Sequence, residues 1–342
     1  MRQTESKAGG FVKPTFQMIA ERAGVGRATA ERVLNGRGGV RPEKVMKVVA
    51  AARALDWPGR LPELHRGILR IEILLVRPDS AFYTRLTRSF QRIAATLDRS
   101  VQLIITHLDE SDPVAIARHI TEAKLPRAGL VVAAPDAGPV REALKAAVGL
   151  GLPVVQVVER IADEADFVGI ENYSVGRTAG LMLSRMCVAA GPVLAICHSG
   201  TYEGHRARMR GFSDYLTGLE TPRHHLIFTA FGQDSRTLNA RRLNEALREW
   251  PDLVAVYNAG GGNTELFEIL SRQKRHIFFV GHELTDTSAG ALRSGVADVI
   301  FDQLPEAQAR RAVNIVLARL GLTDIRIENP PIRFTTVTAE NI

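Results

Sequence analysis

The sequence predicts a small all-α helix-turn-helix unit followed by a two-lobed α/β body built on parallel sheets. Three short helical patterns in residues 14–56 predict the first part. About ten short apolar runs, alternating with amphipathic helical patterns, predict the second, because such alternation is typical of parallel sheets covered on both faces. The expected organisation is a disordered tail over 1–13, a helix-turn-helix over 14–56, a hinge or linker over 57–69 and the body over 70–342.

Composition limits the kind of protein. The chain has 342 residues, 45% apolar and 24% charged, which is enough for a sizeable core and excludes a disordered chain. The two cysteines, Cys187 and Cys197, form no disulfide or zinc pattern and indicate a reducing compartment. The sequence has neither a run of about 18 apolar residues nor the apolar segment of a secretory signal, so we expect a cytoplasmic protein without membrane contact.

The charge is unevenly distributed along the chain. Residues 1–70 contain 14 Lys and Arg against 6 Asp and Glu, whereas residues 71–342 contain 30 against 31. A basic module joined to a near-neutral body is typical of a tethered nucleic-acid binder. A solvated basic face or tail would give the same balance, so charge alone leaves both interpretations open.

Three helices are expected in the N-terminal unit, over 15–23, 27–34 and 42–55. Gly24 ends the first, and Asn35-Gly36 ends the second. A helix, a short Ala-Gly-Val turn and a second short helix form the pattern of a helix-turn-helix. The second helix would place its N-terminal end in the major groove of DNA.

Side chains of this second helix are the candidate DNA contacts. Arg27 can reach base edges, typically O6 and N7 of guanine, and Ala28 can touch a thymine methyl group. Thr29 and Asn35 are better placed for phosphates, which set register. Glu31 opposes binding unless it pairs with an arginine or accepts from a cytosine amine. Ordinary surface charge is the alternative for any isolated arginine, and the turn spacing with the local basic charge favours DNA.

The most specific sequence motif of the chain lies in this unit. It reads Ile19-Ala20-Glu21-Arg22-Ala23-Gly24-Val25, then Ala28-Thr29-Ala30-Glu31-Arg32-Val33-Leu34-Asn35-Gly36, then Val40-Arg41-Pro42-Glu43. This motif resembles that of the LacI family of bacterial transcription regulators, except that Gly26 replaces a usual Ser and Ala30-Glu31 replace Val-Ser. The resemblance implies a homodimer or a tetramer that reads a pseudopalindromic operator in double-stranded DNA. Repression relieved by a small-molecule effector is the family's usual behaviour.

The resemblance also implies a hinge helix within 57–69, where a leucine pair of the dimer wedges the minor groove. Leu61 or Leu64 would be the wedge, and a helix can begin at Pro62 because proline is tolerated in a first turn. The predicted DNA contacts are Thr15, Gly26, Arg27, Ala28, Thr29, Arg32, Asn35 and Leu64.

The body follows a strand–helix rhythm. Strands are expected over 71–76, 101–106, 129–134, 153–158, 167–170, 193–197, 226–231, 253–257, 277–281 and 299–301. About ten strands exceed one sheet of modal size, so two similar lobes are expected. From about Ile71 to Thr336 the body resembles the sugar-binding, periplasmic-binding-protein-like core of the LacI family, most clearly at turns that follow strands. Open α/β sheets bind ligands at these strand ends.

Side chains at these turns suit a sugar or polyol, because hydroxyl groups need both donors and acceptors. Phe82 and Tyr83 can stack on a sugar face, whereas a phosphosugar would need a denser cluster of cations. Taken singly, each residue has a structural alternative, such as a helix cap for Asn172 or a surface carboxylate for Glu283. The predicted ligand-binding residues are Phe82, Tyr83, Arg160, Asn172, Arg206, Asn258, Glu283 and Gln303.

Other chemistry has little support. Gly260-Gly261-Gly262 lacks the lysine and hydroxyl residue of a phosphate loop. His224 and His225 are adjacent and would point to opposite faces of a strand, and His198 with His205 lacks clear further metal ligands. We therefore expect no cofactor, no metal site and no enzymatic activity. A solute-binding protein for transport is one alternative, although it would need a signal peptide and no DNA-binding unit. A constitutive repressor without an effector is another. No leucine heptad follows Pro330-Pro331, which disfavours a tetramerisation coiled coil.

Overall fold

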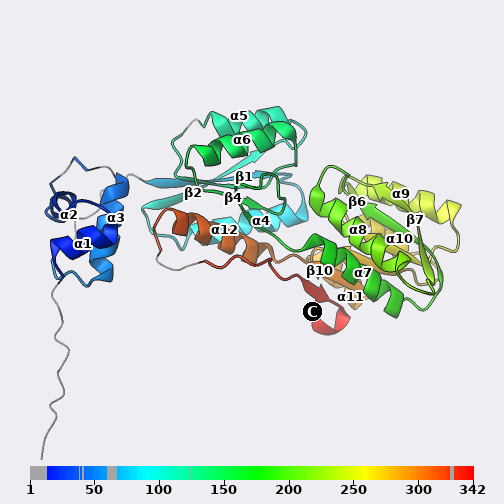
Figure 1. The fold of residues 1–342 in the computed structure, drawn as a ribbon. Helices are drawn as coiled ribbons and strands as arrows, with labels where there is room; N and C mark the ends of the chain where they lie inside the picture. Colours follow the sequence, from blue (N-terminus) through cyan, green and yellow to red (C-terminus); the bar gives the residue numbers. More distant parts are fainter. Residues whose placement is uncertain (1–13, 38, 41, 60–67, 124, 324–326) are drawn as a thin grey trace, which may run out of the picture. The chain divides into compact units, whose positions relative to one another are not determined.

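The computed structural model describes residues 14–37, 39–40, 42–59, 68–123, 125–323 and 327–342. The chain divides into two compact units, Met1–Leu69 with Gly321–Asp324 and Arg70–Leu320 with Ile325–Ile342 (Figure 1). The predicted tail over 1–13 lies outside the described residues. So do Leu61, Pro62 and Leu64 of the predicted hinge.

The N-terminal unit holds three helices: α1 (Phe16–Ala23), α2 (Arg27–Leu34) and α3 (Pro42–Ala54), coloured blue in Figure 1. The predicted helices are confirmed, and each predicted range differs from the observed one by no more than one residue at an end. Gly24 ends α1 in the left-handed region with φ +62°, a conformation that a β-carbon would strain. This turn sets the angle between α1 and α2.

The core of the N-terminal unit is small. Ile19, Ala30 and Val48, one from each helix, are fully buried. At the edge of this core the rings of Phe16 and Trp57 pack with their centroids 5.0 Å apart. The aromatic pair therefore ties the segment after α3 back onto α1.

The second unit consists of two lobes, and lobe 1 is built on a five-stranded sheet of order β2-β1-β3-β4-β5. Its strands are β1 (Leu69–Val76), β2 (Val101–Leu108), β3 (Gly129–Val132), β4 (Val154–Val157) and β5 (Asp166–Val168). Its helices are α4 (Ala81–Ala94), α5 (Pro113–Thr121), α6 (Gly138–Gly149) and α12 (Pro305–Arg319). Figure 1 shows α5 and α6 on one face of the sheet and α4 and α12 on the other. The strands β1, β3, β4 and β5 pair in parallel, as the sequence predicts.

Lobe 2 is built on a six-stranded sheet of order β11-β10-β9-β8-β6-β7. Its strands are β6 (Gly191–Cys197), β7 (His224–Phe231), β8 (Ala255–Asn258), β9 (Phe278–His282), β10 (Val299–Asp302) and β11 (Thr335–Val337). Its helices are α7 (Asn172–Met186), α8 (Glu203–Thr217), α9 (Arg236–Glu249), α10 (Thr264–Ser271), α11 (Asp286–Arg293) and the short 3-10 turn η1 (Ala339–Asn341). All pairings are parallel except that of β10 with β11, a strand that the sequence pattern does not reveal.

Helices α7 and α8 approach each other closely in lobe 2. A β-carbon on Gly176 would overlap the carbonyl oxygen of Arg208, and one on Gly211 would overlap that of Tyr173. The two glycines therefore allow direct contact between the helix backbones. This contact fixes the position of Arg208 relative to the start of α7.

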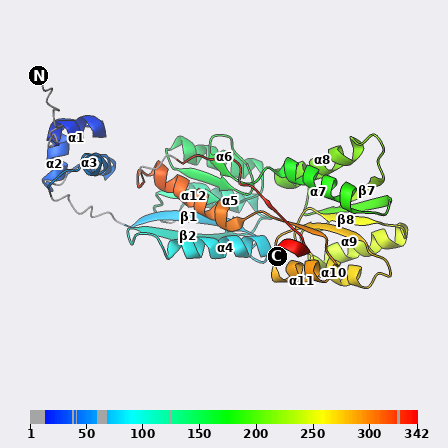
Figure 2. The same cartoon turned by 90° about the horizontal axis from the view of Figure 1, so that it is seen from below.

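The chain passes between the lobes three times: after β5, between β10 and α12, and between α12 and β11 (Figure 2). Two of these segments meet in an isolated parallel bridge between Ile170 and Ile332. In the part of the chain that is described, none of the helices has the length and apolar character needed to cross a bilayer.

Candidate ligand cleft and nucleic-acid interface

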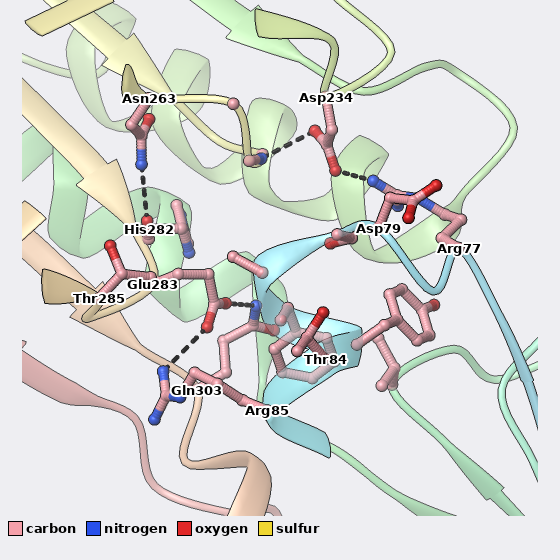
Figure 3. Close-up of a pocket in the computed structure, with 18 of the residues that line it drawn as sticks. Arg77, Asp79, Thr84, Arg85, Asp234, Asn263, His282, Glu283, Thr285 and Gln303 are labelled. Carbon is pink, nitrogen blue, oxygen red and sulfur yellow. Dashed lines mark hydrogen bonds and ion pairs between the residues drawn. The ribbon is translucent and has the colours of Figure 1, made fainter. Parts of the chain in front are cut away.

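A cavity of about 780 Å³ lies between the two lobes. Its walls come from the residues after β1 and the first turn of α4 in lobe 1, and from the residues after β8, β9 and β10 in lobe 2 (Figure 3). Both lobes thus present the carboxyl ends of their strands to one cleft. This is the edge at which open α/β sheets bind ligands.

Two aromatic side chains of α4 line the lobe 1 wall. Phe82 and Tyr83 are buried and pack edge to face, with ring centroids 5.4 Å apart. The guanidinium carbon of Arg77 lies 5.5 Å from the centroid of the Tyr83 ring, within cation–π range. These rings give the cleft an apolar wall beside its charged groups.

Arg208 lines the lobe 2 wall and is only 4% exposed. Its guanidinium donates hydrogen bonds to Asn172 Oδ1 at 2.7 Å, to the carbonyl oxygen of Ala259 at 2.7 Å and to Gln303 Oε1 at 2.5 Å. All three acceptors are neutral, and burial lowers the pKa of Arg208. The hydrogen bonds fix the plane of the guanidinium from three directions.

Arginines of lobe 1 reach carboxylates of lobe 2 across the cleft. Arg77 pairs with Asp234, and both side chains are nearly buried (Figure 3). Arg85 of α4 donates to Asp302 at 2.8 Å and to Glu283 at 3.3 Å. These guanidinium groups therefore already have carboxylate partners within the protein.

Carboxylates of lobe 1 make the reverse contacts. Glu110, after β2, accepts a hydrogen bond from the Tyr202 hydroxyl and lies 3.3 Å from His198 Nε2. Glu159, after β4, accepts from the first two backbone N–H groups of α8. A negative charge is favoured there because the N-terminus of a helix is its positive end. The lobes are therefore joined both by arginines of lobe 1 that contact carboxylates of lobe 2 and by carboxylates of lobe 1 that contact donors of lobe 2.

A glycine loop positions Asp234. The backbone N–H of Gly261 donates to Asp234 Oδ1 at 2.8 Å, and a β-carbon on Gly260 would overlap the same oxygen. Burial raises the pKa of Asp234, but the charge of Arg77 and its hydrogen bond to the carboxylate outweigh burial and lower the pKa to about 2. Asp234 is therefore held as a carboxylate facing Arg77.

Two other carboxyl groups of the cleft behave in the opposite way. Burial raises the pKa of Glu159 to about 7, although its backbone hydrogen bonds partly offset that rise. Burial and the nearby charge of Asp302 raise the pKa of Glu283 to about 7. Both groups therefore exchange protons near physiological pH.

Two buried histidines of lobe 2 are neutral. Burial, helped by the charge of Arg208, lowers the pKa of His205 to about 3, and its Nδ1 accepts from the His198 backbone N–H at 3.1 Å. Burial lowers the pKa of His282 well below the usual histidine value. Neither imidazole adds a positive charge to the cleft at neutral pH.

The structure brings together five of the eight predicted ligand residues, namely Phe82, Tyr83, Asn172, Glu283 and Gln303, as lining side chains of the cleft. The other three do not line it. Arg160 is exposed and covers the Phe167 ring, with its guanidinium carbon 4.9 Å from the ring centroid. Arg206 is half-exposed and pairs with Glu203 at 2.8 Å. Asn258 is buried and donates to the carbonyl oxygen of Gly261, so its side chain stabilises the conformation of the glycine loop.

Several lining residues of the cleft are not among the predicted ones: Arg77, Arg85, Glu110, Arg208, Asp234 and His282. The spacing of small residues in the sequence could have identified Arg208. Gly204, Ala207 and Gly211 are spaced along one helical face, and Arg208 shares it, whereas Arg206 does not. For Arg77 and Asp234 the signal was weaker, a charged residue soon after a strand.

The N-terminal unit presents the residues predicted to contact DNA on and around α2. Gly26, Arg27, Ala28, Arg32, Asn35 and Thr15 are exposed, and Thr29 is half-buried. Thr15 Oγ1 accepts from the Met18 backbone N–H at 3.3 Å and so caps α1. Leu64 lies outside the described residues. The exposed face of α2 is free of large apolar side chains, as a surface that contacts DNA requires.

Comparison with known proteins gives two family matches. The model described as "Periplasmic binding protein domain" matches residues 71–322, and the model described as "Bacterial regulatory proteins, lacI family" matches residues 15–58. No curated protein of similar sequence was found.

Solved structures share the fold of the body. They include an ABC transporter solute-binding protein from Burkholderia graminis in complex with D-arabinose (15% identity, TM-score 0.72, covering 82% of this chain and 98% of that one). A solute-binding protein from Agrobacterium vitis bound with α-D-tagatopyranose is also similar (20%, 0.70, 80% and 95%). So is a protein from Bacteroides fragilis assigned as a LacI transcriptional regulator (20%, 0.70, 80% and 98%). At these identities the likeness shows the fold alone.

The two matches cover the two parts that the sequence predicted, a helix-turn-helix and a two-lobed binding core. Over most of its length the chain belongs to the periplasmic-binding-protein domain family, and residues 15–58 carry the helix-turn-helix of the lacI family of bacterial regulatory proteins, which makes it a lacI-type DNA-binding transcription regulator.

Proposed function

We propose that this regulator is a homodimeric repressor whose affinity for its operator is controlled by a neutral sugar or polyol bound between the lobes. The observation that carries the proposal is the cleft itself. It joins an aromatic wall from lobe 1 to a wall of hydrogen-bonding side chains from lobe 2, in a chain that also has a helix-turn-helix.

The charges of the cleft favour a neutral ligand over a phosphosugar. Arg77 and Arg85 are already paired with carboxylates, and Arg208 is held by neutral oxygens. Glu110, Glu159 and other carboxyl groups add negative charge to the same walls. A phosphate would have to displace these partners, whereas a hydroxyl group can donate to a carboxylate and accept from a guanidinium group.

The proposed regulation follows from linkage. The lobes are joined by three segments, so a ligand that contacts both walls stabilises one arrangement of the lobes over others. If the two arrangements differ in how a dimer spaces its α2 helices, the ligand changes operator affinity, and DNA changes ligand affinity by the same factor. A two-fold dimer would then read a pseudopalindromic site.

A gel-shift titration on the DNA upstream of the coding gene tests the proposal. The wild-type protein is titrated with and without D-arabinose, D-tagatose, D-galactose and ribitol. A sequence-specific shift that one of these compounds weakens is the expected result. A specific shift that no compound changes would instead indicate a repressor without a sugar effector.

The variant Arg27→Ala tests the DNA half of the proposal. It should abolish the sequence preference, because Arg27 is exposed at the first residue of α2, where side chains reach base edges. Arg241→Ala, in an exposed arginine of α9, removes the same charge from the body and should leave the preference unchanged.

Light scattering of the same samples should give twice the mass of one chain.

A further inference from the structure

The guanidinium group of Arg77 lies in a cage of four side chains that come from both lobes. Arg77 directly follows β1 of lobe 1, and its side chain is only 11% exposed. Lobe 1 contributes Tyr83 and Glu110 to the cage. Lobe 2 contributes Tyr202 and Asp234. Each lobe thus supplies one aromatic ring and one carboxylate to the same cation.

The geometry of the cage suits a guanidinium group. The guanidinium carbon of Arg77 lies 5.5 Å from the ring centroid of Tyr83 and 6.0 Å from that of Tyr202, both within cation–π range. Its Nη2 donates to Asp234 (Figure 3), and its Nε lies 3.8 Å from Glu110 Oε1. Aromatic faces and carboxylates are the groups that bind cationic ligands. The cage is therefore a cation site that the chain fills with its own side chain.

The groups of the cage are held in place by other contacts. The hydroxyl group of Tyr202 donates to Glu110, which joins the two lobes a second time beside Arg77. The backbone N–H of Gly261 holds the Asp234 carboxylate from within lobe 2. The rings of Tyr83 and Tyr202 are both buried. The cage is thus a preformed site and not a chance meeting of surface charges.

The backbone is unusual at both ends of the ion pair. Arg77 has φ +54° and Asp234 has φ +51°, in the left-handed region that residues other than glycine rarely adopt. Such a conformation costs free energy and persists only where the surrounding contacts impose it. Here the contact between the two side chains is the one that both residues share.

Burial makes the pair a strong link between the lobes. The side chains of Arg77 and Asp234 are 11% and 12% exposed. Burial lowers the pKa of Arg77, but the charge of Asp234 and the groups beside it outweigh burial and raise that pKa above its usual value. If one partner is removed, the other remains as an unpaired buried charge, which is strongly unfavourable. Separation of the lobes would return that charge to water.

We propose that Arg77 is a built-in cation that holds the two lobes in the arrangement of this structure, called closed below, without any bound ligand. The contacts that a cleft ligand would make to both walls are made here by the chain itself. An effector can then change the arrangement of the lobes only by competing with this contact or by adding to it. The inference goes beyond the proposed function, because it involves neither a sugar nor DNA.

Distances between spin labels on the two lobes test the proposal in the full-length protein, by double electron–electron resonance without sugar or DNA. One pair of labels is attached at Glu142→Cys on α6 and Arg241→Cys on α9. A second pair is attached at Gln91→Cys on α4 and Arg185→Cys on α7. All four positions are exposed, and α4 and α6 lie on opposite faces of their sheet, so the two pairs follow a rotation of the lobes from different sides.

The native cysteines need a blank measurement. Cys187 and Cys197 are both buried. Wild-type protein treated with the spin label measures any label that they take up.

The wild type should show one population, at the distances of this structure. Arg77→Ala and Asp234→Asn remove the contact from opposite lobes, so the proposal stays testable if one of them fails to fold. Each should lower the ratio of the closed population to a displaced one about tenfold or more, the usual effect of losing a buried hydrogen bond between charged groups. Arg319→Ala is the matched control. It removes an arginine that pairs with Asp166 at 3.0 Å within lobe 1, and it should keep the wild-type distances.

Chemical rescue identifies the group that matters. Ethylguanidinium replaces the atoms that Arg77→Ala removes, and at millimolar concentration it should restore the closed population of that variant. Ethylammonium should restore it much less, because an ammonium group lacks the planar fork of a guanidinium. Neither compound should close Asp234→Asn, in which the cage has lost its principal carboxylate.

Two results would overturn the proposal. One is a wild type that already shows mainly displaced distances in the absence of sugar. The other is a closed population in Arg77→Ala and Asp234→Asn equal to that of the wild type. Because the samples contain no sugar and no DNA, failure of the gel-shift experiment would leave this result standing. Failure of the distance measurement would likewise leave the proposed function standing.

Discussion

At the scale of single residues, the cleft contains carboxyl groups with opposite proton affinities. Asp234 has a depressed pKa because Arg77 outweighs the effect of its burial, whereas burial dominates at Glu159 and Glu283. All three groups take part in contacts between the lobes: Asp234 with Arg77, Glu159 with the backbone N–H groups of α8, and Glu283 with Arg85. The stability of the body should therefore depend on pH in two separate windows.

In the acid window, Asp234→Asn should lower the free energy of unfolding at pH 7 by about 2–3 kcal/mol, because Arg77 loses its principal partner. The folded pKa of Asp234, about 2, is below its value in the unfolded chain. The stabilisation is therefore present above pH 4 and is lost as the pH falls toward 2. Urea denaturation should show the variant and the wild type converging in stability between pH 4 and pH 2, whereas exposed Asp163→Asn should match the wild type throughout.

In the neutral window, Glu159→Gln should gain stability relative to the wild type as the pH rises from 5 to 8. The folded pKa of Glu159, about 7, exceeds its usual value of 4.5. The carboxyl group therefore contributes fully to the stability of the folded wild type below pH 4.5, and this contribution is lost as the pH rises toward 7. The relative gain should reach about 2 kcal/mol. Glu142→Gln, at an exposed glutamate of α6, provides the baseline. A constant difference across this range would contradict the raised pKa.

Thr15 caps α1 and is also one of the predicted DNA contacts. Thr15→Asp keeps a capping oxygen at the N-terminus of α1 and adds a negative charge, so the N-terminal unit should melt at or above the wild-type temperature. Operator affinity should fall at least about tenfold if Thr15 is one of the DNA contacts, as the sequence predicts, because the new carboxylate would repel the phosphates. Unchanged affinity in a gel shift would restrict Thr15 to capping.

At the scale of secondary-structure elements, the contact between α7 and α8 positions the site. Gly211→Ala should lower stability by about 2–3 kcal/mol, since its β-carbon would meet the backbone of α7. Ligand affinity should fall as well, because Arg208 and Asn172 lie on the two helices that would separate. Gly290→Ala in α11 is the matched control. Its β-carbon would meet nothing within 4 Å, and it should be neutral or slightly stabilising in thermal melts.

Most elements were predictable because they are local. The alternation of apolar runs and amphipathic helices indicates ten of the eleven strands, and helical spacing with Gly24 indicates the three N-terminal helices. The exception, β11, has three residues and is defined only by its pairing with β10. Its short sequence, Thr335–Val337, carries too few positions for a period to show.

At the scale of the whole molecule, the cleft could be predicted only in part. Strand ends can be read from the sequence, and five lining residues were found in that way. The ion pairs across the cleft cannot be predicted from the sequence, because Arg77 and Asp234 are 157 residues apart and no periodicity connects them. Arg206 was selected by its position near a strand end, although the packing of α7 against α8 places Arg208 at the cleft.

The ring pair at the edge of the N-terminal unit has a spectroscopic consequence. The chain contains two tryptophans, Trp57 in that unit and Trp250 at the end of α9 in lobe 2, so each unit carries one tryptophan that can be excited selectively. In Trp250→Phe the emission reports only the segment packed on Phe16, and in Trp57→Phe it reports only the body. Operator DNA should therefore perturb the first signal and a sugar the second, and each should report a ligand bound at the distant site only if the two units are coupled.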